Sequence, residues 1–196
     1  MYLTFGHTKR KSLLRQSGGL LEITSLARAS ELSRPTTISY LDALELTHAV
    51  HVVRPYHAGG TRELVRQPRV YGFDTGFVAH VRGWSDLRPD DCGVLWEHLV
   101  LDTLGSIPNV RVHHWRDKQR REVDFVVPRE RGACVAIECK WSASGFDPTG
   151  LRAFRALHPR GENLVVVPRR GAPLRRRYGD LAVRIVWAGD LRRLLG

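Results

Sequence analysis

Three charged residues in the second half of the chain have the types and the spacing of a hydrolytic site. Asp124 lies inside residues 121–127, where apolar and polar side chains alternate as they do in a strand. Glu138 and Lys140 end a second apolar segment, residues 134–141. Side chains two positions apart on a strand point to the same face. A hairpin between the two strands would therefore bring Asp124 beside Glu138 and Lys140.

Two carboxylates and one lysine in this arrangement fit metal-dependent cleavage of a phosphodiester. Carboxylate oxygens are the ligands that a hard cation prefers, so Asp124 and Glu138 are predicted to hold Mg²⁺ or Mn²⁺. Lys140 is predicted to position the attacking water and to offset charge on the phosphate. The chain has only 4 lysines against 27 arginines, which makes a lysine at this position notable. Charges within apolar strands are costly unless they are paired or bind a metal.

A third carboxylate belongs to a predicted helix over residues 93–105. At about 100° per residue, the apolar side chains of this helix span an arc of about 120°, and Glu97 falls in its middle. Such a carboxylate faces the core or a site, so Glu97 is predicted to bind a second metal or to tune the first. The spacing fits equally well an internal salt-bridge cluster in which Glu97 and Asp124 pair with Lys140 and an arginine.

The elements around these residues predict two domains. Residues 90–196 follow the order helix, three strands, helix, two strands, helix, which indicates an α/β domain. Residues 15–80 predict two short helices, capped by Thr24 and by Ser33 with Pro35 in the first turn. A hairpin follows, with strands at 49–54 and 69–73 and its tip within 55–62. This order is typical of a winged helix-turn-helix, and the polar residues 82–91 would join the two domains.

Nucleic acid is the expected partner, with DNA first. The chain of 196 residues carries 31 basic and 20 acidic residues, a net charge of +11, although the excess of arginine also fits a GC-rich coding sequence. Phosphate or base contacts are expected from the second helix, the wing and the turn before residue 121. These residues are Thr36, Ser39, Tyr40, Arg62, Arg66, Arg116, Lys118, Arg120 and Arg121. The run Arg175–Arg177 fits either a further DNA contact or a solvated loop.

The composition excludes several other classes of protein. Hydrophobic residues make up 42% and charged residues 26%, which are values of a globular protein. No apolar run approaches the roughly 20 residues that a membrane span needs, so no membrane partner is expected. The first residues lack the pattern of a signal peptide, and the three cysteines form no paired motif, which favours a cytoplasmic location.

The residues of the predicted site, taken with their flanking segments, resemble a known family. The matching segments are SLARASELSRPTTISYLDAL (25–44), RVYGFDTG (69–76), LWEHLV (95–100), HWRDKQRREVDFVV (114–127) and AIECKW (136–141). They are similar to the C-terminal domain of unknown function that follows the ATPase in many bacterial and archaeal AAA+ proteins. The resemblance implies a winged helix-turn-helix joined to a restriction-endonuclease-like PD-(D/E)xK core with a mixed central sheet. Its acidic and lysine positions map onto Glu97, Asp124, Glu138 and Lys140.

These observations lead to one expected function and two alternatives. The expected function is a DNA-binding, Mg²⁺-dependent nuclease. The family's ATPase has no counterpart in this sequence, so no ATP is expected as a cofactor. The first alternative is a non-catalytic module that docks on DNA or on an AAA+ ATPase, with the nuclease fold kept as a scaffold. A transcriptional regulator that uses only the winged helix is the second, but it would leave the carboxylates unexplained.

Overall fold

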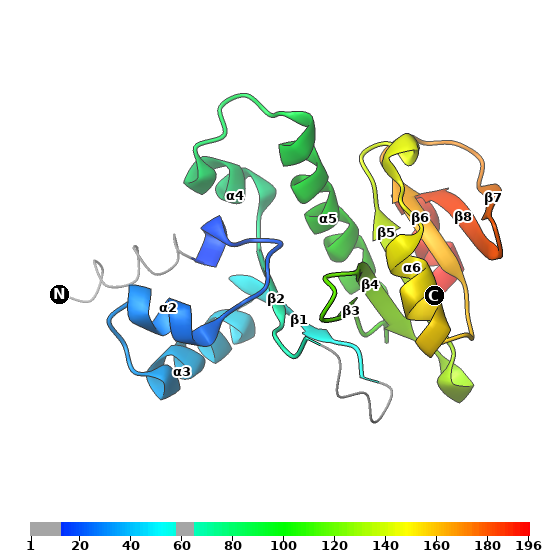
Figure 1. Cartoon of the computed structure of the whole chain (residues 1–196). Helices are drawn as coiled ribbons and strands as arrows, with labels where there is room; N and C mark the ends of the chain where they lie inside the picture. The colour runs from blue at the N-terminus through cyan, green and yellow to red at the C-terminus, as the bar shows by residue number, and fades with distance from the viewer. Residues whose placement is uncertain (1–12, 58–64) are drawn as a thin grey trace. The chain divides into compact units, whose positions relative to one another are not determined.

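A computed structural model describes residues 13–57 and 65–196 of the chain. These residues divide into two compact units, and the boundary does not follow the sequence strictly. The first unit holds residues 13–53 and Gln67–Leu87, and the second holds residues 54–57, 65–66 and Arg88–Gly196. Most helices and strands of the two units are labelled in Figure 1.

Two short helices, α2 (Ile23–Ala29) and α3 (Arg34–Leu46), open the first unit. Ser33 caps α3 as predicted, because its Oγ accepts a hydrogen bond of 3.2 Å from the backbone N–H of Thr36. The predicted cap of α2 is wrong. Thr24 lies inside that helix, which begins one residue earlier, and Glu22 precedes it without a side-chain cap bond.

Strands β1 (Val50–Pro55) and β2 (Arg69–Gly72) form the predicted antiparallel hairpin, with Val50 opposite Gly72. The expected tip lies largely outside the described residues, and so does Arg62. The last two residues of β1 differ from the expectation, because Arg54 and Pro55 pair in parallel with the second unit's strand β3 (His113–Arg116). The far part of the predicted wing is therefore bound into the second unit's sheet.

Helix α4 (Thr75–Arg82) was not predicted. It begins after Asp74, whose Oδ1 accepts a hydrogen bond of 2.6 Å from the N–H of Phe77. It ends at Gly83, which takes the left-handed conformation that glycine adopts without strain (φ 72°). The core of the first unit joins α2, α3, β1 and β2 through Leu13, Leu21, Leu26, Leu41, Val50 and Val70.

The second unit is built on a mixed sheet, so the predicted α/β class is confirmed at this level. Its strands are β3, β4 (Glu122–Pro128), β5 (Cys134–Cys139), β6 (Asn163–Val167), β7 (Leu174–Tyr178) and β8 (Leu181–Trp187). Their order is β3-β4-β5-β6-β8-β7, with the end of β1 added beside β3. The pairs β5–β6 and β6–β8 are parallel, whereas β3–β4, β4–β5 and β7–β8 are antiparallel.

The helices of this unit are α5 (Pro89–Gly105), α6 (Thr149–Leu157) and α7 (Leu191–Leu195). Helix α5 begins four residues before the predicted start, with a proline in its first turn. Its first turn is closed by Asp91, whose Oδ2 accepts a 3.1 Å hydrogen bond from the N–H of Arg88. Three strands follow α6 instead of the predicted two, because the arginine run lies in β7. Alternation of apolar and polar residues is the sequence signal of a strand, and this charged run lacks it, so β7 was not predicted.

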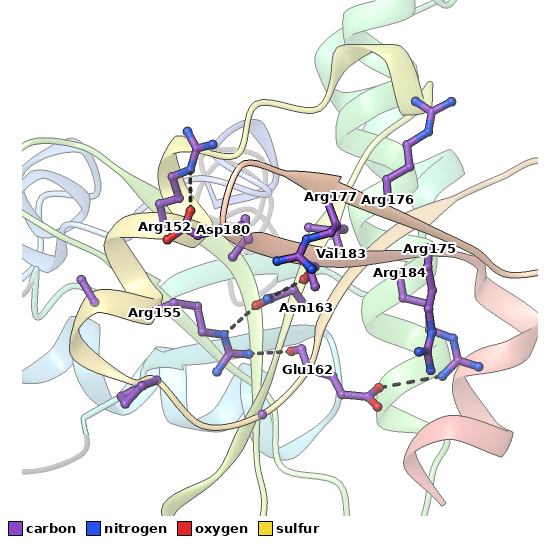
Figure 2. A pocket seen from close by; sticks show the side chains of 15 residues that line it. Arg152, Arg155, Glu162, Asn163, Arg175, Arg176, Arg177, Asp180, Val183 and Arg184 are labelled. Carbon is purple, nitrogen blue, oxygen red and sulfur yellow. Dashed lines mark hydrogen bonds and ion pairs between the residues drawn. The ribbon is translucent and has the colours of Figure 1, made fainter.

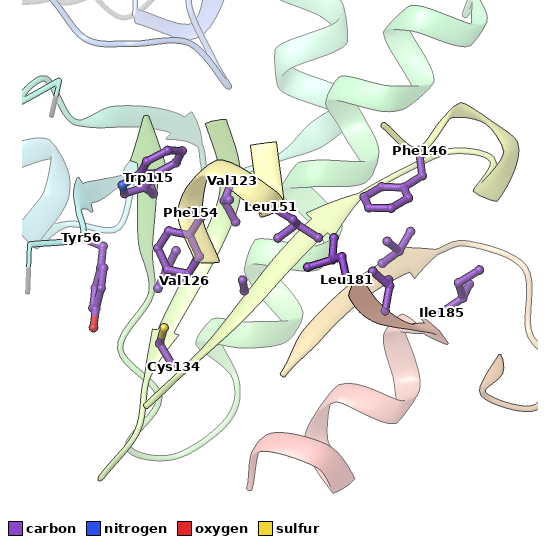
Figure 3. Packing of buried hydrophobic residues seen from close by; sticks show 13 residues of the cluster. Tyr56, Trp115, Val123, Val126, Cys134, Phe146, Leu151, Phe154, Leu181 and Ile185 are labelled. Carbon is purple, nitrogen blue, oxygen red and sulfur yellow. The ribbon is translucent and has the colours of Figure 1, made fainter. Parts of the chain in front are cut away.

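The core around α6 fixes the helix on the sheet, as Figure 3 shows. Leu151 and Phe154 are completely buried in it, and the ring of Phe154 meets that of Trp115 edge-on at 5.5 Å. Helix α5 is fixed to the sheet by the indole of Trp96, which donates a hydrogen bond of 2.9 Å to the carbonyl of Val166 on β6. These two anchors hold the strands that bear the predicted site residues.

Candidate functional site

Strands β4 and β5 place Asp124 and Glu138 side by side. Phe125 pairs with Ile137, so the next step of the same register sets Asp124 opposite Glu138. Both carboxylates are buried, with only 4% and 5% of the residue surface exposed. The Oδ2 atom of Asp124 accepts a hydrogen bond of 2.8 Å from the backbone N–H of Cys139. That bond fixes the Asp124 side chain against the end of β5.

Lys140 completes the predicted group. Its Nζ lies 2.9 Å from Oε2 of Glu138, so both side chains point to the same side of the sheet. Its backbone N–H donates a 3.0 Å hydrogen bond to the carbonyl of Val166, which keeps the residue beside β6 after β5 has ended. The predicted proximity of Asp124, Glu138 and Lys140 is therefore observed.

Burial and charge determine how these groups ionise. Burial raises the pKa of Glu138, the negative charge of Asp124 raises it further, and Lys140 opposes both, with a resulting pKa of about 8. Burial acts on Lys140 in the opposite direction, but the charges of Asp124 and Glu138 outweigh it and raise the pKa of the ammonium group. The group thus combines Asp124, a Glu138 carboxyl that keeps its proton up to about pH 8, and a firmly protonated lysine. A cation that displaces the Glu138 proton gains a second carboxylate ligand.

Glu97 reaches the same region from α5. The thiol of Cys139 is buried, which raises its pKa well above the ordinary value, and the charges of Asp124, Glu97 and Glu138 add to that rise. All three predicted carboxylates therefore lie within electrostatic range of one thiol. Glu97 is only partly buried, unlike Asp124 and Glu138.

The donor set fits a cation held by two carboxylates. Across residues 13–57 and 65–196, no three histidine, cysteine, aspartate or glutamate side chains are grouped closely enough to hold a metal ion. Glu97 thus does not complete a three-ligand group with Asp124 and Glu138. Mg²⁺ is commonly held by one or two carboxylates, with waters and substrate phosphates as its other ligands. Asp124 and Glu138 fit this mode, and Glu97 acts at longer range.

The turn that precedes β4 divides the predicted DNA contacts into two kinds. Arg121 donates through Nε to Oδ2 of the buried Asp117 at 2.6 Å, and Arg116 pairs with Glu122 at 3.1 Å. These two arginines therefore have structural partners. Lys118 and Arg120 lie at the tip of the turn and are exposed.

Helix α3 presents the predicted polar residues to solvent. Thr36 and Tyr40 are exposed, with 51% of Tyr40 accessible, and Arg66 of the predicted wing is exposed as well. The Oγ of Ser39 donates within the helix to the carbonyl of Pro35 at 3.3 Å. The helix also carries two acidic residues and a single basic one, which weakens its attraction for phosphate.

Trp141 is a candidate that sequence reasoning missed. It follows Lys140 directly, and 49% of its surface is exposed, which is unusual for so large an apolar side chain. Exposed aromatic rings beside a nucleic-acid site commonly stack on bases. The only sequence signal was the position of the tryptophan next to the lysine.

No helix in the described part of the chain combines the length and the apolar character that crossing a membrane requires.

Comparison with known proteins links both parts of the chain to domains without an assigned function. Residues 10–88 match the family model of a domain of unknown function (DUF8612), and residues 92–186 match that of another (DUF4143). Two uncharacterized proteins, from Mycobacterium bovis and Mycobacterium tuberculosis, are each 31% identical over 121 residues. The aligned region covers 59% of this chain and 27% of each relative. The part of the chain that aligns thus spans about a quarter of the length of these relatives.

Proposed function

We propose that the chain is a DNA-binding, metal-dependent phosphodiesterase whose site is formed by Asp124, Glu138 and Lys140. One observation carries the proposal: two buried carboxylates lie opposite each other on β4 and β5, with Lys140 Nζ 2.9 Å from Glu138. A scaffold gains little from two neighbouring buried carboxylates, because they repel each other and lose hydration. A bound divalent cation offsets both costs.

Each residue has a role in the proposed reaction. Asp124 and Glu138 would hold Mg²⁺ or Mn²⁺, which activates a water molecule and neutralises phosphate charge when it is bound. Lys140 would orient the attacking water and contact the non-bridging oxygen of the scissile phosphate. Glu97 would adjust the charge of the site from α5, and Trp141 would stack against a base near the cleaved bond. In hydrolysis the water oxygen would bond to phosphorus as the bond from phosphorus to one sugar oxygen breaks, and that oxygen would leave as a hydroxyl after it takes up a proton.

A second candidate function is a docking module for DNA or for an AAA+ ATPase. Two observations favour it. The relatives are about four times longer than the matching region, so this region can serve as an appended module. The family that matches residues 92–186 is also associated with AAA ATPases. Under this alternative the chain binds its partner, and the carboxylates act only in folding.

A cleavage assay separates the two functions. Purified protein is mixed with labelled single-stranded and double-stranded DNA in Mg²⁺, Mn²⁺ or EDTA, and the products are resolved on a gel. We expect cleavage with either metal, none in EDTA, and none with Asp124→Asn. The matched control is Asp86→Asn, since Asp86 is exposed and belongs neither to the site nor to the lining of the pocket formed by α6, β7 and β8. Cleavage that persists in Asp124→Asn would exclude the assigned site, and DNA binding without cleavage would favour the docking module.

A further inference from the structure

A groove rich in arginine lies in the second unit, at the amino end of strand β6. It has a volume of about 820 Å³ and is formed by α6, the start of β6 and the β7–β8 hairpin (Figure 2). Six arginines line it: Arg152, Arg155, Arg175, Arg176, Arg177 and Arg184. Only two lining residues are acidic, Glu162 and Asp180. The groove therefore carries a large excess of positive charge.

Its position separates it from the candidate catalytic site. Asn163 at the start of β6 lines the groove and pairs with Ala136. Lys140, in contrast, bonds to Val166 near the end of the same strand. The groove thus lies at the amino end of β6, whereas Glu138 pairs with the central residue Val165 and Lys140 lies further toward the carboxyl end.

One arginine is part of the framework of the groove. The guanidinium of Arg155 donates to the side chain of Asn163 at 2.6 Å. It also donates to backbone carbonyls of Cys134, His158, Arg160 and Glu162. These hydrogen bonds hold Arg155 rigidly, and Arg155 in turn fixes residues 158–163, which form one wall of the groove. Most of its N–H donors are already used, so few remain for a ligand.

The two acidic residues neutralise the groove only weakly. Asp180 is 3.8 Å from Arg152, and Glu162 is 3.9 Å from Arg184, both near the upper limit for an ion pair. The Asp180 and Glu162 side chains are 93% and 62% exposed, so solvent screens these pairs. The positive potential of the arginines therefore extends into the groove.

Strand β7 contributes three exposed arginines to this surface. Arg175 lies directly opposite Arg184 on β8, and like charges in that relation destabilise a sheet. Arg175 and Arg177 share one face of the strand and are roughly 7 Å apart along it. Positively charged side chains at regular intervals along a strand are complementary to a linear ligand that carries negative charges at regular intervals.

We propose that this groove binds the phosphate backbone of a nucleic-acid strand. Phosphate oxygens would accept hydrogen bonds from Arg175 and Arg177 and would relieve the repulsion between Arg175 and Arg184. No aromatic side chain is among the described residues that line the groove, so contact is with phosphates and is independent of base sequence. The site adds a binding surface to the proposed function but does not depend on catalysis.

The test measures binding in EDTA, where cleavage cannot occur. Fluorescence anisotropy gives the affinity of wild type and of the double variant Arg175→Gln/Arg177→Gln for a labelled DNA duplex at several salt concentrations. The slope of log affinity against log salt is negative, and removing two phosphate contacts should make it shallower by about 1.8. Wild type should then lose about tenfold more affinity than the variant between 50 and 200 mM salt.

The matched control is Arg111→Gln/Arg193→Gln, which removes the same charge from residues that do not line the groove. Equal losses in both double variants would mean that only net charge matters, and would overturn the proposal. Unchanged binding in Arg175→Gln/Arg177→Gln would also overturn it, and would assign these arginines to the protection of an open sheet edge. If the protein bound inorganic triphosphate at micromolar concentration but bound no duplex, the ligand would be a small phosphate compound, and the proposal of a nucleic-acid strand would be overturned. Circular dichroism checks that each variant is folded.

The result of this binding test can be distinguished from the result of the cleavage assay. A chain that binds DNA through the groove but never cleaves it would support the groove and contradict the phosphodiesterase. A chain that cleaves DNA with the groove variants unaffected would do the reverse.

Discussion

Lys140 Nζ lies 2.9 Å from Oε2 of Glu138 at the end of β5, and Asp124 lies opposite Glu138 on β4. One ammonium group therefore serves two buried carboxylates. Once Glu138 loses the proton that its raised pKa of about 8 lets it keep, the charge that remains is negative and is enclosed by protein on most sides, because both carboxylates are at least 94% buried. This imbalance is the physical basis for the expected divalent cation.

The first prediction concerns the ion pair itself. Lys140→Met removes the partner of a buried carboxylate and should lower the free energy of unfolding by about 3 kcal/mol. The same change should raise the pKa of Glu138 further, since Lys140 holds it down. Urea unfolding measures the first effect, with Lys118→Met as the control for loss of an exposed lysine. Equal stability of the two variants would contradict a structural ion pair.

The second prediction concerns pH. The pKa of Glu138 is raised to about 8 in the folded protein, against 4.5 ordinarily. The folded state thus retains a proton that the unfolded state releases between these values. The free energy of unfolding of the metal-free protein should therefore fall as the pH rises from about 4.5 to about 8.

Asp124→Asn should flatten this fall, because the charge of Asp124 is the largest cause of the raised pKa after burial. An asparagine oxygen can still accept the bond from Cys139 N–H, so the fold should persist. Urea unfolding of both proteins in EDTA at several pH values checks this. A wild-type stability that rises steadily over the same range would be inconsistent with a protonated Glu138.

The third prediction distinguishes a framework arginine from a surface arginine. Arg155→Met leaves several backbone carbonyls beside residues 158–163 without a donor and should cost about 3 kcal/mol in unfolding free energy. Arg152→Met removes a side chain that is 47% exposed and should cost less than about 1 kcal/mol. Similar losses in urea unfolding would show that Arg155 does not hold that loop.

The fourth prediction separates the roles within the turn before β4. Arg121→Ala removes the partner of the buried Asp117 and should lower stability by about 1 kcal/mol. Lys118→Ala should leave stability unchanged but weaken DNA binding and reduce its salt slope by about 0.9. Thermal melts and anisotropy on both variants check this pattern. If Lys118→Ala binds like wild type at every salt concentration, the tip of the turn does not contact phosphate.

The sequence alone was sufficient to predict the central strands β4 and β5 and the placement of their charged residues. The two-residue spacing of Glu138 and Lys140 and the hairpin before them place both side chains with Asp124. The cap at Ser33 was readable as well, because a hydroxyl before a proline-containing first turn has a direct physical meaning.

Other features depend on contacts that the local sequence does not encode. The end of β1 pairs with β3, which lies nearly sixty residues later, so the hairpin pattern alone implied a free wing. Strand β7 has no apolar alternation and is held by pairing with β8. Helix α4, in contrast, carried its signals in Asp74 and Gly83 and could have been predicted from them.

The most direct test of the central claim is a thermal melt of wild type and Asp124→Asn, each in EDTA and in Mn²⁺. If Asp124 and Glu138 hold a cation, Mn²⁺ should stabilise wild type by about 2.7 kcal/mol when the free metal is 100 times the dissociation constant. Asp124→Asn should melt at the same temperature with or without Mn²⁺. An equal effect of Mn²⁺ on both proteins, or none on wild type, would contradict the metal site.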